Sequence, residues 1–268
     1  MNPLHYVEIP LERLAIAAVL IAVAVWLSRW NRLSLEKDLL WGALRGAVQL
    51  ILIGHVLLLL FAHQTPGWVA LALGVMVLVA GYTSSRRVEH GPPWRRLFPF
   101  ALVSLGAGAA VALIPVFLWV VPLEPWFNAR YTIPIGGMML SNAMNVVALV
   151  FERIFAAAAA SSDEIEQMLA LGATPKQALD RHTRASVRAA MIPTINGLLT
   201  VGLVALPGMM TGQLISGTAP EQAVRYQIVI MYQLVAVAAV AGVVAVAFAR
   251  RLLFTARAQL SLPVTPKA

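Results

Sequence analysis

The residues of this chain with the clearest potential chemistry are amide and thioether side chains inside strongly apolar stretches. Asn142 and Asn145 are three residues apart, so a helix would place both on one side. Amide oxygens suit hard metal ions and thioether sulfurs suit soft ones, but both groups also simply pack between helices. The candidates for a transport pathway or substrate site are Gln49, Asn142, Asn145, Asn196, Met209, Met210 and Gln213.

Motifs for intrinsic catalysis are absent from the sequence. A phosphate-binding loop needs a lysine after a glycine, and none of the three lysines (Lys37, Lys176 and Lys267) follows one. Neither H-E-x-x-H nor G-x-S-x-G occurs, and the five histidines have no metal-binding spacing. The lack of cysteine excludes disulfides and thiolate metal sites. The sequence therefore predicts no enzyme and no bound cofactor, and it leaves the identity of any metal unknown.

Membrane helices must position these candidates. Hydrophobic residues make up 60% of the 268-residue chain and charged residues only 12%, against about 25% charged in soluble domains. A membrane helix needs roughly 20 mainly apolar residues, and seven stretches qualify. The third is one of the two shortest, and a re-entrant segment there would change the topology that follows. The stretches are residues 11–27, 39–61, 67–84, 98–121, 133–155, 192–216 and 227–249.

The basic residues indicate how these helices are oriented. With the N-terminus outside, sixteen of the 20 Lys and Arg residues lie in cytoplasmic segments and only Arg13, Arg130 and Arg225 lie outside, while Arg45 falls within the second helix. This is a strong positive-inside bias. It predicts an all-α multi-pass protein of the inner membrane, a single transmembrane domain over residues 1–268 with a cytoplasmic C-terminus. It also accounts for the net charge of +8 without a nucleic-acid partner.

The longest polar segment, residues 156–191, has the pattern of two helices separated by a sharp break. Ser161 or Ser162 would begin the first helix, and Gly172 would end it. Thr174 would cap the second helix, with Pro175 in its first turn. Such a segment can dock on a partner or can be a solvated connection, and its form alone leaves both roles open.

Several motifs, in order along the chain, resemble those of a transporter family. They include I-P-I-G-G-M at 133–138, G-A-T-P at 172–175 and, most specifically, L-P-G-M-M-T-G at 206–212. Residues 166–175 also resemble, in part, the coupling segment of ABC transporter permeases. From about residue 10 to 250, the chain is similar to the FetB/YbbM-like family of ABC permeases.

The resemblance implies a permease that works as a pair of identical chains and exports iron. ATP and Mg would be bound by a separate ATPase subunit, and related plant proteins are linked to aluminium tolerance. The coupling segment would dock on the ATPase and act as a lever on the sixth helix. Its contact residues would be Glu164, Glu166, Leu171, Gly172, Ala173, Thr174, Pro175 and Lys176.

Other functions remain as alternatives. Asn196 and Gly197 stand where some family members carry an acidic or hydroxyl-bearing pair, and the few membrane charges also suit an organic or lipid-like cargo. An ion-coupled secondary transporter usually needs acids inside the membrane, but Glu152 is the only acid in a predicted span apart from Glu12 at the very start of the first. A membrane scaffold that transports nothing is a further alternative.

Overall fold

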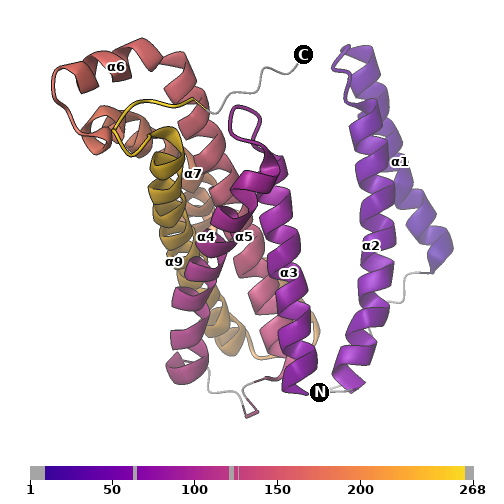
Figure 1. Cartoon of the computed structure of the whole chain (residues 1–268). Coiled ribbons are helices and arrows are strands. Elements are labelled where there is room, and N and C mark those ends of the chain that lie inside the picture. Colours follow the sequence, from indigo (N-terminus) through magenta and orange to yellow (C-terminus); the bar gives the residue numbers. More distant parts are fainter. Residues whose placement is uncertain (1–9, 63–64, 121–123, 126, 263–268) are drawn as a thin grey trace. The chain divides into compact units, whose positions relative to one another are not determined.

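The computed structural model describes residues 10–62, 65–120, 124–125 and 127–262 (Figure 1). It confirms the all-helical membrane architecture, and it forms two compact units, Met1–Gln64 with Ile215–Gly217 and Thr65–Leu214 with Thr218–Ala268. Each unit is described by itself. The helices are α1 (Leu11–Trp30), α2 (Glu36–Ala62), α3 (Pro66–Arg86), α4 (Trp94–Pro115), the π-helical turn η1 (Val116–Val120), α5 (Ala129–Ala160), α6 (Ser162–Ala170), α7 (Pro175–Thr200), α8 (Gly208–Ile215) and α9 (Pro220–Leu253).

Five helices in the described part of the chain are long and apolar enough to cross a membrane. They are α2, α3, α4 together with η1, α5 and α9. The third predicted stretch is thus a helix of 21 residues, whereas the apolar part of α1 is shorter, Ile16–Trp30. The total of seven membrane helices stays a prediction.

The sixth predicted stretch, residues 192–216, is not one helix, which corrects the sequence analysis. Helix α7 ends at Thr200, α8 begins at Gly208, and the backbone turns between them. Gly202 has a φ of +80°, and its N–H donates to the carbonyl of Ala205 at 3.0 Å. Pro207 has no N–H with which to continue a helix. The chain is therefore broken here, and not only kinked at Pro207.

Helices α1 and α2 form a hairpin in the first unit. The buried hydroxyl of Ser28 donates to the Glu36 carboxylate at 3.2 Å and accepts from the N–H of Leu35 at 3.1 Å. One side chain thus fixes the end of α1 and the start of α2. Beyond this turn, most of the large apolar side chains of α2 are exposed, as expected of a helix that faces lipid.

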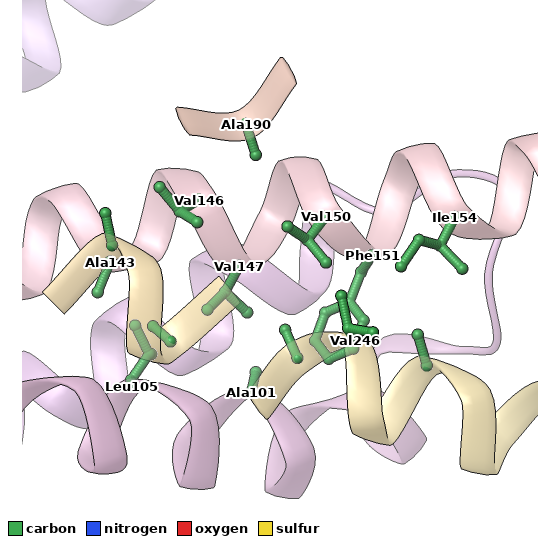
Figure 2. Packing of buried hydrophobic residues seen from close by; sticks show 14 of the residues in the cluster. Ala101, Leu105, Ala143, Val146, Val147, Val150, Phe151, Ile154, Ala190 and Val246 are labelled. Carbon is green, nitrogen blue, oxygen red and sulfur yellow. The ribbon is translucent and has the colours of Figure 1, made fainter. Parts of the chain in front are cut away.

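Helices α3, α4, α5, α7 and α9 run alongside one another in the second unit (Figure 1). Helix α5 is the most buried, and Figure 2 shows Val147, Val150 and Phe151 packed among residues of α4 and α9. Small residues let these helices approach: a Cβ added to Gly108 of α4 would lie 2.9 Å from the carbonyl oxygen of Val237 in α9. Such contacts drive helix association in membranes.

The segment between α5 and α7 has the predicted helix–break–helix form. Gly172, with a φ of +90°, ends α6 in a Schellman motif. The N–H of Gly172 donates to the carbonyl of Leu169 at 3.0 Å, and the N–H of Ala173 donates to the carbonyl of Met168 at 3.0 Å. Thr174 and Gln177 form a capping box at the start of α7. Ile165 and Leu179 are fully buried, so α6 is held against the rest of the second unit.

Candidate functional site

Asn142, in the middle of α5, joins three helices. Its amide nitrogen donates to the carbonyl of Leu234 in α9 at 2.8 Å. Its amide oxygen accepts from the hydroxyl of Thr194 in α7 at 3.0 Å. We call the contact between α5 and α7 the Asn142–Thr194 bridge. Thr194 is buried and Asn142 is half-buried, so the bridge is only partly exposed to solvent.

A cleft of about 510 Å³ opens on one side of this bridge, and we call it the inner cleft because it lies toward the predicted cytoplasmic ends of α3 and α5. Arg87 caps the C-terminus of α3, and its guanidinium donates to the amide oxygen of Asn145 at 2.9 Å. The side chains of Arg87 and Asn145 are exposed. The lining consists of Arg87, Asn142, Asn145, Val146, Ala148, Leu149, Glu152, Ala190, Pro193 and Thr194.

Glu152 lies at the far end of the inner cleft and holds the loop between α3 and α4. Its carboxylate accepts from the N–H of Glu89 at 2.6 Å and from the N–H of His90 at 3.2 Å. A third bond joins it to the Nδ1 of the His90 ring. This acid is therefore occupied by structural hydrogen bonds.

A second cleft, of about 290 Å³, opens on the other side of the bridge and is called the outer cleft. It is bounded by the break between α7 and α8 and by Met231 and Leu234 of α9. It shares three lining residues with the inner cleft, namely Asn142, Pro193 and Thr194. The Asn142–Thr194 bridge is thus the common wall of the two clefts.

Of the candidate pathway residues, the structure brings together Asn142 and Asn145 only. Asn196 is exposed on α7, and Met209 packs against the hydrophobic core. Met210 and Gln213 are half-buried in α8. None of these four lines either cleft. Gln49 lies exposed in the first unit, whose placement relative to the clefts is not determined.

The predicted coupling residues form the turn between α6 and α7 and its flanks. Leu171 is 89% exposed at the tip of the turn. Glu164, Glu166, Gly172, Thr174 and Lys176 are exposed around it, whereas Ala173 and Pro175 are half-buried. Glu164 faces Arg181 at 3.9 Å. The turn therefore presents one apolar side chain within a polar, charged rim.

Sequence reasoning did not select Thr194, Arg87 or His90 as site residues. Nothing in the local pattern distinguishes Thr194 from other hydroxyls, because its role depends on contact with α5. Arg87 counted only as a positive-inside charge. Glu152 did carry a signal, as an acid within a predicted span, and its pairing with His90 shows how α5 accommodates it.

Comparison with known protein families identifies the family to which the chain belongs. Residues 11–254 match the family described as "Uncharacterised protein family (UPF0014)". The chain belongs to the UPF0014 family. This match covers both compact units and both clefts, and it confirms the resemblance found in the sequence.

Curated members of the UPF0014 family come from plants and bacteria. The chain is 41% identical to the membrane protein STAR2 of Oryza sativa over 216 residues, or 80% of this chain and 73% of that one. It is 37% identical to Protein ALUMINUM SENSITIVE 3 of Arabidopsis thaliana over 218 residues, 81% and 77% of the two chains. It is 35% identical to the "Probable iron export permease protein FetB" of Escherichia coli over 219 residues, 82% of each. No solved structure matches.

Proposed function

We propose that this chain is the membrane-spanning permease subunit of an ABC transporter of the inner membrane and exports iron or a related metal. ATP and Mg would bind to a separate ATPase subunit, since the chain has no phosphate-binding loop of its own. We call the turn between α6 and α7, residues 171–175, the coupling turn. The observation that carries the proposal is a single helix, α7, that begins at this exposed turn and ends beside both clefts. A relative described as a probable iron export permease supports the cargo.

The coupling turn has the form of a docking element. Leu171 is available to enter a hydrophobic groove, and the charged rim can set the orientation of the partner. The Schellman hydrogen bonds at Gly172 and the capping box at Thr174 hold the angle between α6 and α7. A push on Leu171 would therefore move α7 and would not be absorbed by a flexible loop.

Helix α7 transmits such a push to the clefts. Thr194 lies 19 residues after Pro175, or about 30 Å along a helix. Pro193 precedes it, and a proline inside a helix removes one backbone hydrogen bond and favours bending. We infer that movement of α7 opens and closes the Asn142–Thr194 bridge. The inner and outer clefts would then be connected alternately to the two sides of the membrane.

A functional transporter requires two permease chains and two ATPase subunits. We propose a symmetric pair of this chain, embedded in lipid, with one coupling turn docked in each ATPase subunit. No nucleic acid takes part, because the basic residues are explained by the positive-inside rule.

A second candidate function is an ABC permease for an organic or lipid-like cargo. Two observations favour it. Most of the surface that lines the clefts is apolar, and the described residues contain no group of three His, Cys, Asp or Glu side chains that could hold a metal ion. An ion-coupled transporter is disfavoured, since Glu152 is held by donors from residues 89 and 90.

The docking step can be tested with the variant Leu171→Asp. We expect the wild-type chain to co-purify with its ATPase and the variant to lose most of the bound ATPase, with an unchanged melting temperature because Leu171 is exposed. The control is Gln259→Asp, which introduces the same charge at an exposed residue outside the turn. Equal recovery of the ATPase with Leu171→Asp and with the control would refute docking at this turn.

A further inference from the structure

We propose that the inner cleft recognises an oxyanion, the carboxylate or phosphate group of a small molecule. A metal cargo would therefore enter as a complex with such a ligand, and not as a bare ion. This inference rests on the proposed function for its cargo, but the binding site itself does not depend on an ATPase.

The side-chain oxygens of Asn142, Asn145 and Glu152 in the inner cleft each accept at least one hydrogen bond. The amide oxygen of Asn142 accepts from Thr194, and that of Asn145 accepts from Arg87. Both carboxylate oxygens of Glu152 accept from residues 89 and 90. Hard cations need several oxygen ligands, so a bare metal ion would have to compete with these hydrogen-bond donors for the same oxygens.

The hydrogen-bond donors of the inner cleft are used less fully than its acceptors. A guanidinium carries five N–H groups in a planar fork that matches a carboxylate or a phosphate. Arg87 uses one nitrogen on Asn145 and forms no ion pair among the described residues. It is also the only Lys or Arg among the lining residues of the inner cleft.

Asn145 has a positioning role in this arrangement. Its oxygen holds the Arg87 guanidinium at 2.9 Å, at the rim of a cleft of about 510 Å³. Its amide N–H₂ group supplies further donors beside the guanidinium. The volume suits a small organic acid, alone or complexed with a metal ion, and the apolar Val146, Ala148 and Leu149 would line the rest of the cleft.

The phosphate of a lipid headgroup has the same chemistry and could reach an arginine at the end of a membrane helix. The binding test therefore uses the full chain in nanodiscs of zwitterionic lipid and, separately, in nanodiscs with anionic lipid. The probes are citrate, ferric citrate, inorganic phosphate and ferrous iron alone, measured by calorimetry.

We expect citrate and ferric citrate to bind in zwitterionic nanodiscs and ferrous iron alone not to bind. Arg87→Gln should weaken citrate binding at least tenfold, and Asn145→Leu should weaken it less. The matched control is Arg86→Gln, because Arg86 is also exposed but lies over the ring of Tyr82, at 5.9 Å from its centre, outside the cleft lining. All three variants should keep the wild-type melting temperature.

Three results would overturn the proposal. Citrate could bind equally to the wild type and to Arg87→Gln. Ferrous iron alone could bind with an affinity that depends on Asn145 or Glu152. Anionic lipid could be the only probe that distinguishes Arg87→Gln from the wild type, which would make Arg87 a lipid anchor. The binding assay contains no ATPase, so a negative binding result leaves the permease proposal intact. Equally, a failure of the ATPase to co-purify would not affect a positive binding result.

Discussion

Asn142 and Asn145 look equivalent in the sequence, but the structure gives them different roles. Asn142 uses both ends of its amide to join α7 and α9, whereas Asn145 faces the inner cleft and holds Arg87. The sequence predicted that both lie on one side of a helix. It could not predict which of them meets neighbouring helices, because that depends on Thr194 and Leu234, 52 and 92 residues away.

Replacing Asn142 should destabilise the fold more than replacing Asn145. Hydrogen bonds between membrane helices contribute about 0.6 kcal/mol on average, and Asn142 forms two of them. We expect Asn142→Leu to lower the free energy of unfolding by about 1–2 kcal/mol. Asn145→Leu, at an exposed site, should change it by less than about 0.5 kcal/mol. Unfolding in mixed micelles measures both, and equal losses would contradict the structural role of Asn142.

At the level of elements, the contact between α4 and α9 depends on a glycine. A Cβ at Gly108 would lie 2.9 Å from the Val237 carbonyl oxygen and 3.0 Å from the Cβ of Ala241, so Gly108→Ala must push the helices apart. Overpacking of this kind costs about 1–3 kcal/mol. Gly106, on the same helix, has open space, and Gly106→Ala should stabilise α4 by up to about 1 kcal/mol. Thermal unfolding should show opposite signs for the two variants, and matching signs would count against this packing.

Hydropathy predicted the long helices, and cap residues predicted the turn between α6 and α7. The stretch 133–155 lies inside α5, which extends beyond it to Ala129 and Ala160. Gly172, Thr174 and Pro175 act locally, so their roles could be read without knowledge of the packing. The sixth stretch was predicted wrongly because residues 201–206 are apolar apart from Gly202. Average hydropathy carries no information on the backbone turn that Gly202 and Pro207 permit.

At the level of the whole molecule, the orientation predicted from the basic residues can be measured directly. The chain has no cysteine, so single cysteines can be introduced without background. Ala219→Cys precedes α9 on the predicted outer side, and Gln259→Cys follows it on the cytoplasmic side, and both residues are exposed. In intact cells, a membrane-impermeant maleimide should label only the first variant. Labelling of the second variant alone would reverse the topology.

The assembled site was beyond the reach of the sequence. Its polar groups come from α5, from α7 and from the C-terminal cap of α3, and they meet only after the second unit has folded. Asn142 and Asn145 were found because polar residues in apolar stretches stand out. Arg87 was not found, because an arginine at a helix end is expected from the positive-inside rule alone.

The most direct test of the account is ATP hydrolysis by the cognate ATPase co-purified with this chain in nanodiscs, with and without iron supplied as ferric citrate. The variant is Gly172→Val, since a branched side chain at a φ of +90° costs about 1–2 kcal/mol and distorts the turn. The control is Ala170→Val, at an exposed helical position nearby. We expect iron to stimulate hydrolysis with the wild type and the control, and the stimulation to be lost with Gly172→Val. Stimulation unchanged by Gly172→Val, or an ATPase that never co-purifies with the wild-type chain, would contradict coupling through α6 and α7.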